Sequence, residues 1–188
     1  MAYAREFPRL RVQLDLSNRM IDIVGEGYDL AVRTGNISDM RLVGRQIAVR
    51  PLETCASPQY LAEHGEPAHP SDLPRHRCVI GTTGTWHFLD GATPRLFSPQ
   101  SAWRCNSGKI IVEAAAQGMG ICQLPGFYVT RAIAEGRLRP ILRRYKSAPE
   151  PVWAAYPQKR HLQPKVKQLV ERLQSSLQYR INHDVDFD

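Results

Sequence analysis

The most informative run of apolar and polar positions lies between Asn106 and Phe127. Apolar residues recur at helical spacing after Asn106 and Ser107, which are good N-cap residues. Residues 121–124 form a short apolar run typical of a buried strand, and Gly126 and Phe127 begin a second helix. Short links between helix, strand and helix are typical of parallel α/β sheets. The pattern therefore predicts an α/β fold with two helix N-termini beside strand ends, where such sheets bind small ligands and anions.

The N-terminal part predicts a second unit of this kind. Residues 1–7 have the pattern of the end of a helix, which Pro8 stops. Residues 11–16 alternate between polar and apolar and predict a strand, residues 17–24 predict a helix, and residues 28–33 predict another strand. This order predicts a βαβ unit. Its ligand-facing edge would consist of Ser17, Asn18, Arg33, Thr34 and Gly35.

The remaining pattern predicts elements on both sides of the central stretch. Residues 44–56 form an extended run that is long enough to cross between two lobes. Ser57 and Pro58 begin a helix as its N-cap and N1 residues. The other predicted elements are a helical turn at residues 71–73, short strands at 78–81, 86–89, 95–97 and 102–105, a helix at 127–133, an edge strand at 138–142, a return strand at 152–156 and a helix at 164–177. Residues 179–188 have no period, which predicts a flexible tail.

Composition restricts the class of protein. With 188 residues, 43% hydrophobic and 23% charged, the chain can bury a core as one domain or two small lobes. No apolar run approaches the roughly 20 residues of a membrane-spanning helix, and the N-terminus lacks the apolar region of a secretory signal. We therefore expect a cytoplasmic location and no membrane partner.

The four cysteines, Cys55, Cys78, Cys105 and Cys122, lack the C-x-x-C spacing of a zinc or redox site. We expect them to be small buried hydrophobes in a reducing cytosol. The alternative is a peroxide-sensing pair, which nothing in the spacing favours.

The net charge of +7 is compatible with a nucleic-acid partner. The basic residues gather late, in residues 137–146 and at Lys159, Arg160, Lys165 and Lys167. Neither stacking aromatic residues nor a helix-turn-helix pattern accompanies them. A solvated basic face is therefore favoured over a phosphate-binding track.

Motifs of common catalytic sites are missing from the sequence. G-x-S-x-G, H-E-x-x-H and the phosphate loop ending in G-K-[ST] are all absent. Residues 81–85 have the composition of a phosphate loop, but they lead into a strand and not into a helix. The histidines fall mainly in connections, and no carboxylate pair recurs at the predicted ligand edges. We therefore expect no enzyme activity, no metal site and no cofactor.

Several motifs together closely resemble the effector-binding domain of LysR-type transcriptional regulators. They follow the family's order and spacing from residue 3 to about residue 177, at residues 19–35, 42–45, 55–61, 115–125 and 156–165. The pattern is most similar to the branch of the family that has an aromatic-rich strand, here at residues 85–88.

The resemblance implies a fold like that of the type II periplasmic binding proteins, with two α/β lobes joined by two crossing strands. Each lobe would be a mixed sheet flanked by helices. Lobe I would comprise residues 1–54 and 154–178, lobe II residues 55–153, and a flexible tail residues 179–188. The implied cleft residues are Ser17, Asn18, Arg33, Thr34 and Gly35 from lobe I, and Thr82, Thr83, Asn106, Ser107, Gly126 and Phe127 from lobe II. Hydroxyls, backbone N–H groups and positive helix ends suit a small carboxylate as effector.

Two features of the family are missing from this sequence. One is the N-terminal winged helix-turn-helix with its linker helix, and the other is the first strand of lobe I. We therefore hypothesise that the chain is a fragment of a longer regulator, for which DNA is a partner only through the absent domain. Family members also pair these domains in homodimers or tetramers, and Tyr3, Phe7 and Val12 lie in the corresponding region.

The leading hypothesis is a sensory module, in which a small-molecule effector closes the two lobes and shifts the arrangement of a homodimer or tetramer. The rival is a stand-alone solute-binding protein of a transporter, which shares the fold but needs export. An enzyme on the same fold is disfavoured by the failed search for catalytic groups.

Overall fold

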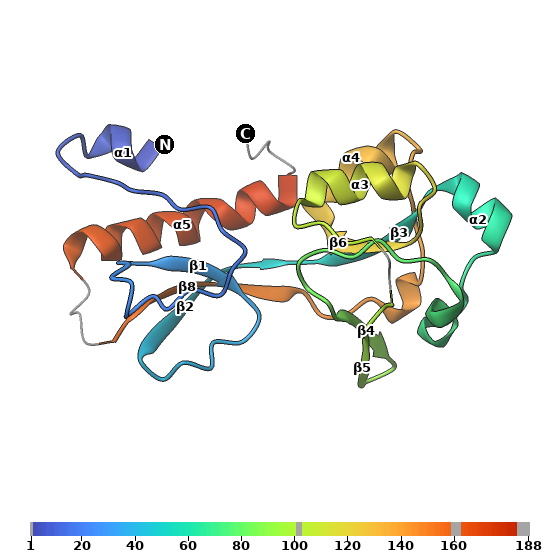
Figure 1. The fold of residues 1–188 in the computed structure, drawn as a ribbon. Coiled ribbons are helices and arrows are strands. Elements are labelled where there is room, and N and C mark those ends of the chain that lie inside the picture. The colour runs from blue at the N-terminus through green and yellow to red at the C-terminus, as the bar shows by residue number, and fades with distance from the viewer. Residues whose placement is uncertain (1, 101–102, 159–162, 184–188) are drawn as a thin grey trace. The chain divides into compact units, whose positions relative to one another are not determined.

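The computed structural model describes residues 2–100, 103–158 and 163–183 (Figure 1). Its helices are α1 (Ala2–Glu6), α2 (Pro58–His64), η1 (Pro70–Arg75), α3 (Gly108–Ala116), α4 (Gly126–Ala134), η2 (Arg143–Tyr145) and α5 (Pro164–His183). Its strands are β1 (Ala31–Thr34), β2 (Leu42–Arg50), β3 (Leu52–Ala56), β4 (Trp86–Asp90), β5 (Thr93–Phe97), β6 (Cys122–Pro125), β7 (Arg139–Pro140) and β8 (Glu150–Pro157). These elements form two compact units. Unit 1 comprises Met1–Ala48 and Val152–Leu177, and unit 2 comprises Val49–Pro151 and Gln178–Asp188.

Unit 1 is built on a sheet with the strand order β1-β8-β2. β1 pairs antiparallel with β8, so that Arg33 lies opposite Trp153. In Figure 1, α5 lies along this sheet. The buried residues of this unit include Ile23, Leu42, Ala155, Val166 and Val170. The helix predicted from residue 164 is therefore present as α5, and its apolar side is buried in the core of unit 1.

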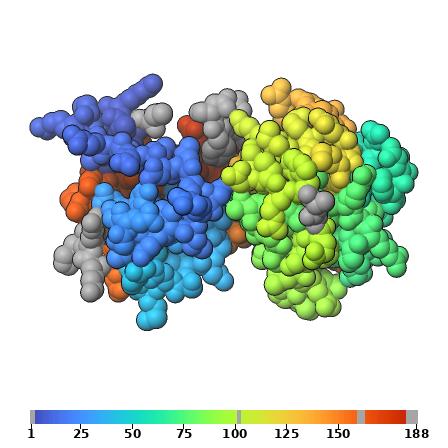
Figure 2. Space-filling view, viewed as in Figure 1, coloured from blue at the N-terminus to red at the C-terminus, as the bar shows by residue number. Residues whose placement is uncertain are grey.

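Two elements predicted for unit 1 are wrong. Residues 11–16 form no strand, and residues 17–24 contain only the start of a turn at residues 23–27 instead of a helix. The alternating apolar residues of the predicted strand are exposed, with 89% of Leu16 open to solvent, and Figure 2 shows this N-terminal segment on the surface. A strand needs a ladder partner and a short helix needs an apolar face to bury. Only Ile23 of this segment enters the core, so the predicted βαβ unit does not form.

Unit 2 is built on a mixed sheet. β3 lies between β6 and β7 and pairs antiparallel with both. Two parallel bridges continue the sheet beyond β6, one between Cys78 and Ile121 and the other between Ile80 and Arg104. Figure 1 shows α3 and α4 on one face of this sheet and the β4-β5 hairpin on the other. The parallel pairing predicted around the central stretch is therefore present, but the strands predicted at residues 78–81 and 102–105 are reduced to these single bridges, and residue 102 lies outside the described residues.

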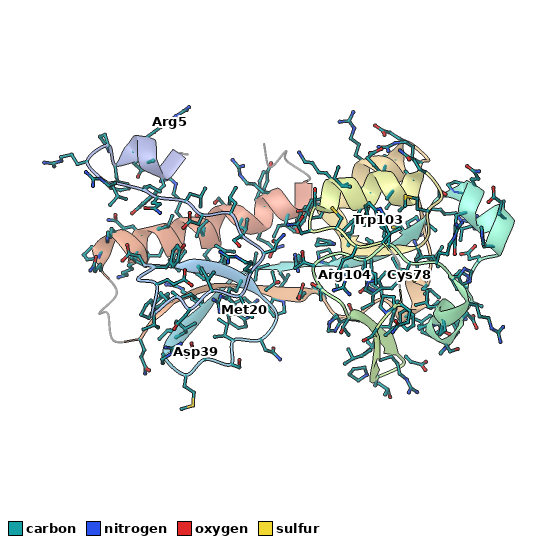
Figure 3. The ribbon with its side chains drawn as sticks, viewed as in Figure 1. Arg5, Met20, Asp39, Cys78, Trp103 and Arg104 are labelled. Atoms are coloured by element: carbon teal, nitrogen blue, oxygen red, sulfur yellow. The ribbon has the colours of Figure 1, made fainter. Side chains whose placement is uncertain are left out.

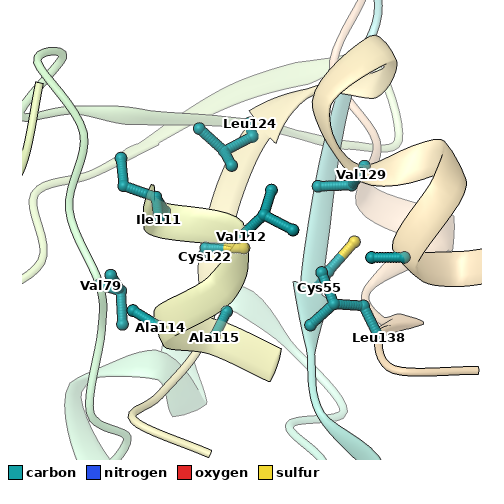
Figure 4. Close-up of a cluster of buried hydrophobic side chains, with 11 residues drawn as sticks. Cys55, Val79, Ile111, Val112, Ala114, Ala115, Cys122, Leu124, Val129 and Leu138 are labelled. Carbon is teal, nitrogen blue, oxygen red and sulfur yellow. The ribbon is translucent and has the colours of Figure 1, made fainter. Parts of the chain in front are cut away.

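Each face of the unit 2 sheet carries a hydrophobic cluster. The cluster beneath α3 and α4 comprises Cys55, Val79, Ile111, Val112, Ala114, Ala115, Cys122, Leu124, Val129, Ala132 and Leu138 (Figure 4). The cluster on the hairpin side comprises Ala56, Tyr60, Leu61, Leu73, Cys78, Ile80, Trp86, Phe88, Ile121, Ile141 and Leu142. Successive residues such as Cys55 and Ala56 enter different clusters because side chains alternate across a strand.

Local sequence signals were sufficient for several elements. The Ser57 Oγ accepts a hydrogen bond from the Tyr60 N–H at 3.1 Å, so α2 begins as predicted with Pro58 in its first turn. The extended run predicted at residues 44–56 is present as β2 and β3. Pro51 separates these two strands because proline has no N–H group to donate to a ladder.

The C-terminal helix is longer than predicted. α5 continues to His183, whereas the flexible tail was predicted to begin at residue 179. Ile181 is buried, and the Gln178 side chain makes two hydrogen bonds to the backbone of Val49. Its Oε1 accepts from the Val49 N–H at 2.7 Å, and its Nε2 donates to the Val49 carbonyl at 3.1 Å. These tertiary contacts stabilise the last turns; residues 184–188 of the predicted tail lie outside the described residues.

Candidate functional site

Three strand ends meet at one edge of the unit 2 sheet. Residues 78–80 are bridged in parallel to residues 103–105 on one side and to the start of β6 on the other. The Cys105 N–H donates to the Ile80 carbonyl at 3.0 Å. Because these segments run in the same direction, their carboxyl ends lie along one edge of the sheet. The predicted site residues that follow these ends are Thr82, Thr83, Asn106, Ser107, Gly126 and Phe127, and we call them the unit 2 edge.

Two helix N-termini adjoin the unit 2 edge. α3 begins at Gly108 after the N-cap Ser107, and α4 begins at Gly126. A Cβ atom on Gly108 would lie 2.6 Å from the Tyr128 ring, so the first turns of the two helices touch. Neither first turn contains an acidic residue. The positive ends of both helices are therefore not offset by a carboxylate of their own first turn.

The predicted capping of α3 is only partly correct. Ser107 is the N-cap residue, but its side chain makes no capping hydrogen bond. Its backbone N–H donates to the Cys105 Sγ at 3.5 Å. Thr82 and Thr83 are exposed at the same edge. Hydroxyl groups at this edge are therefore placed where a ligand could reach them, instead of being used to start the helix.

Arg104 is a charged residue at this edge that the sequence analysis missed. It lies between Trp103 and Cys105, which pack against the core cluster under α3, so its side chain points to the opposite face of the sheet. Its guanidinium lies against the Thr82–Thr83 loop, where a Cβ atom on Gly84 would be 3.5 Å from Nη2. Figure 3 shows Arg104 beside Trp103. The sequence signal that could have indicated Arg104 is a single charged residue between two apolar ones, in the predicted strand that ends just before Asn106.

Apolar surface accompanies these polar groups. The rings of Phe127 and Tyr128 lie 4.6 Å apart at the start of α4. Ile110, in the first turn of α3, is half exposed, and Tyr128 is partly exposed. The unit 2 edge therefore combines hydroxyl groups, two positive helix ends and an arginine with an aromatic and aliphatic border, which is the usual make-up of a small-molecule site.

The predicted site residues of unit 1 have structural partners of their own. The Arg33 guanidinium donates to the Ile21 carbonyl. The Gly35 carbonyl accepts a hydrogen bond from the Trp153 Nε1–H at 2.7 Å. Thr34 and Asn18 are exposed, and the Ser17 Oγ accepts from the Arg19 N–H at 3.2 Å, so Ser17 caps a turn and not the predicted helix. The combination of these residues with the unit 2 edge in one site stays a prediction.

A surface groove in unit 1 contains none of the predicted site residues. It has a volume of about 480 Å³ and lies between α1 and α5. Its lining residues are Tyr3, Glu6, Phe7, Pro8, Arg9, Leu10, Lys165 and Gln168. The groove is thus not part of the predicted site.

The structure brings two of the cysteines together. Cys55 on β3 lies opposite Cys122 on β6, and both are fully buried (Figure 4). Burial raises the pKa of the Cys78 and Cys122 thiols to about 12, and it also raises the pKa of the Cys55 thiol. A thiol that stays protonated is a poor nucleophile. The arrangement supports the interpretation as buried hydrophobes and disfavours a peroxide-sensing pair.

We expect the native protein to react with Ellman's reagent at Cys105 well before the other three thiols. Cys105 is partly exposed, whereas Cys55, Cys78 and Cys122 are buried. The thiolate fraction falls about tenfold for each unit by which the pKa rises, so the rates should differ at least about 100-fold. The release of thionitrobenzoate measures this reaction. If one thiol per protein still reacted rapidly in a Cys105→Ser variant, the assignment of the fast reaction to Cys105 would be contradicted.

Ion pairs neutralise much of the basic run in residues 137–146. Arg137 pairs with Glu113 and Glu135. Arg139 pairs with Glu66, and Lys146 pairs with Glu53. Lys165 pairs with Asp29, while Lys159 and Arg160 lie outside the described residues. These pairs support the interpretation as a solvated face over a phosphate-binding track.

No helix among the described residues is long and apolar enough to cross a membrane. Within the same ranges, no group of three or more His, Cys, Asp or Glu residues could hold a metal ion.

Comparison with known sequences identifies relatives over nearly the whole chain. Residues 1–178 match the family model described as LysR substrate binding domain. An uncharacterised HTH-type transcriptional regulator of Haemophilus influenzae is 34% identical over 168 residues, which cover 87% of this chain and 58% of that protein. The HTH-type transcriptional regulator DmlR of Escherichia coli is 31% identical, over 100% of this chain and 61% of its own length. The chain therefore spans less than two thirds of the length of these curated relatives.

Solved structures agree with the fold. The regulatory domain of CrgA, a LysR-type transcriptional regulator from Neisseria meningitidis, has a TM-score of 0.75 and 28% identity over 94% of this chain and 88% of that chain. The regulatory domain of AphB in Vibrio vulnificus has a TM-score of 0.75 and 22% identity over 93% of this chain and 88% of that chain. The predicted fold class, a mixed α/β fold of the type II periplasmic-binding-protein kind, is confirmed.

Proposed function

Because this chain belongs to the LysR substrate-binding domain family, we propose that it senses a small anionic metabolite for a DNA-binding transcriptional regulator. The chain is a regulatory domain of that family, and its curated relatives are transcriptional regulators and not enzymes. In this proposal unit 1 and unit 2 are the two lobes, and the effector contacts residues of both.

The observation that carries the proposal is the unit 2 edge. Three parallel segments end there, and α3 and α4 begin there with their first turns in contact. Open α/β sheets bind ligands at the carboxyl ends of such strands. The effector would accept hydrogen bonds from backbone N–H groups of the first helical turns and from the Thr82 and Thr83 hydroxyls.

The charges at this edge favour an anion. Arg104 lies against the loop that carries Thr82 and Thr83, and the first turns of α3 and α4 contain no carboxylate. An arginine can hold a carboxylate by two parallel hydrogen bonds. Phe127 and Tyr128 would contact the apolar part of the same molecule. A small organic acid with an apolar or aromatic body fits this set of groups.

The further partners follow from the family. We propose that effector binding changes how two or four copies pair, and that DNA is bound by a separate N-terminal domain of the full-length regulator. The rival function, a solute-binding protein of a transporter, uses the same fold. The relatives favour the regulator, because they are named as HTH-type transcriptional regulators.

The test is thermal unfolding of this domain against a panel of small carboxylates, uncharged aromatic compounds and sugars. A carboxylate that binds should raise the unfolding midpoint in a saturable way, by about 2.7 kcal/mol of added stability at 100 times its dissociation constant. Arg104→Gln should weaken that binding by about 10- to 100-fold, because a hydrogen bond to a charged group contributes about 1.5–3 kcal/mol.

The matched control is Arg144→Gln, which removes an exposed arginine of η2 that is not among the residues of the proposed site. Its dissociation constant for the carboxylate should equal that of the unchanged protein. Saturable binding of a sugar or neutral aromatic compound, without any carboxylate, would overturn the anionic effector. Equal affinities of the Arg104→Gln and unchanged proteins would remove Arg104 from the site.

A further inference from the structure

Away from the unit 2 edge, two histidines and an arginine surround the ring of Tyr60. The Tyr60 side chain is fully buried, and the His64 ring stacks on it at 4.4 Å with an interplanar angle of 9°. The His76 ring lies 6.0 Å away, and the Arg77 guanidinium carbon is 5.7 Å from the Tyr60 ring centroid. We call Tyr60, His64, His76 and Arg77 the Tyr60 cluster.

The hydrogen bonds of the Tyr60 hydroxyl fit a neutral form of His76. The Arg77 backbone N–H donates to the Tyr60 hydroxyl oxygen at 2.9 Å. The Tyr60 hydroxyl is therefore an acceptor there, and its own hydrogen is available to the His76 Nδ1, which is 3.3 Å away. In this arrangement the His76 Nδ1 accepts, so that the ring carries its proton on Nε2.

The hydrogen bonds of His64 define the opposite tautomer. Its Nδ1 lies 3.2 Å from the Tyr60 carbonyl oxygen, which can only accept, so Nδ1 carries the proton. The His64 Nε2 is then left with a lone pair directed to the Arg77 Nη2, at 3.4 Å. A second proton on Nε2 would replace this acceptor with a donor and place a positive ring against a guanidinium.

Few carboxylates oppose this positive charge. On α2, Glu63 accepts a hydrogen bond from Gln59, and in the following loop Glu66 pairs with Arg139. On η1, Arg75 adds a cation, and Asp72 accepts from the backbone N–H groups of Ala68 and His69. Cys78 follows Arg77, and its thiol contacts the His76 carbonyl. Of these, Asp72 favours protonation of His76, whereas burial and the neighbouring His64 oppose it and lower the pKa of His76.

Arg77 also connects the cluster to the central stretch of the chain. Its Nη2 donates to the Gly118 carbonyl at 3.5 Å, and its own carbonyl accepts from the Ile121 N–H at 2.9 Å. Residues 117–121 form the link between α3 and β6, whose other ends form part of the unit 2 edge. A change in the position of Arg77 therefore acts on the elements that carry the proposed effector site.

We propose that the Tyr60 cluster is an acid-responsive contact site of this regulatory domain, which connects α2 to the α3–β6 link. Proton uptake by His76 breaks the contact of its ring with the Tyr60 hydroxyl, and loosens the attachment of α2 and, through Arg77, of the α3–β6 link. This response to acid does not depend on which effector binds. It assigns a second input, proton concentration, to the same domain.

The direction of the pH effect follows from linkage. The pKa of His76 is lower in the folded protein than in the unfolded chain. Its neutral form therefore contributes stability that is present in full above the ordinary histidine pKa of about 6.5, and that is lost as the pH falls to the folded pKa. Carboxylates with lowered pKa values, such as Asp39 with about 2, lose their contribution only below the ordinary carboxylate pKa. Between about pH 7 and pH 5, His76 should therefore determine the slope.

The experiment is thermal unfolding of the domain between about pH 7.5 and pH 5. We expect the midpoint of the unchanged protein to fall by about 3 °C or more over this range. In the His76→Gln variant, the glutamine side chain keeps a neutral acceptor but cannot titrate, so at least half of this fall should disappear. The control, His87→Gln, removes an exposed histidine of β4 and should leave the fall unchanged.

A nitrogen-detected NMR spectrum of the histidine rings tests the hydrogen bonds of the Tyr60 cluster independently of stability. At about pH 7.5, His64 should carry its proton on Nδ1 and His76 on Nε2. Tyr60→Phe should raise the pKa of His76, because it removes the hydroxyl that donates to Nδ1. A His76→Gln variant that retains the full pH slope, or a His76 ring protonated on Nδ1 alone, would overturn the proposal.

Discussion

Gly120→Ala should lower the free energy of unfolding of this domain by about 3 kcal/mol or more. A Cβ atom on Gly120 would lie 2.4 Å from the Arg77 carbonyl oxygen and 2.7 Å from the carbonyl carbon, both of which are backbone atoms. The φ angle of Gly120 is +153°, a conformation that L-residues rarely adopt. Relief of the clash would also separate the Arg77 carbonyl from the Ile121 N–H that donates to it. Urea unfolding followed by circular dichroism measures the loss.

Gly65→Ala is the matched control, because it separates backbone strain from steric overlap. Gly65 ends α2 with a φ angle of +78°, and a Cβ atom there would have no atom within 4 Å. Its ψ angle of 163° places it in a backbone region that is almost exclusive to glycine, so its replacement should cost only the conformational term, about 1–3 kcal/mol. Equal losses in the two variants would show that the close approach of Gly120 to Arg77 contributes nothing.

The two glycines after α3 show what a sequence can predict and what it cannot. Glycines directly after a helical run are typical of a helix end that needs left-handed backbone, and Gly118 has this conformation, with a φ angle of +78°. The stronger requirement at Gly120 comes from Arg77, which lies far away in the sequence. A local pattern contains no information on which distant backbone will approach.

The same distinction explains which elements were predicted correctly. α2, α3 and α4 have caps, breakers or helical spacing within their own residues. Residues 11–16 have the right alternation for a strand, but no described strand pairs with them, and their apolar side chains remain in solvent. An alternating pattern predicts which face of a strand would be buried. The segment becomes a strand only if a neighbouring strand pairs with it.

In the candidate site, too, some features follow from local sequence and others depend on tertiary pairing. The positions of Asn106 and Gly126 at helix starts were predictable because each belongs to a local pattern, whereas Thr82 and Thr83 were implied only by the family resemblance. Their common edge depends on the parallel bridges of residues 78–80 to two other segments, which is tertiary information. Arg104 was missed because its proximity to Gly84 arises only from that pairing.

Trp86→Ala should lower the free energy of unfolding by about 3–5 kcal/mol. Trp86 is 2% exposed and belongs to the hairpin-side cluster of unit 2, where its ring lies 5.9 Å from that of Phe97. An isolated two-stranded hairpin is at best marginally stable. The hairpin β4-β5 therefore depends on this side chain to hold it on the sheet. Thermal and urea unfolding of the variant measure the effect.

Leu96→Ala is the control on the opposite side of the same hairpin. Leu96 lies next to Phe97 on β5 but is 69% exposed, so its truncation leaves no cavity and should change stability by less than about 0.5 kcal/mol. A loss for Trp86→Ala as small as that for Leu96→Ala would mean that the hairpin does not pack on the sheet. Trp86 would then not support residues 81–85, and the loop with Thr82 and Thr83 would lack the rigid base that a binding site requires.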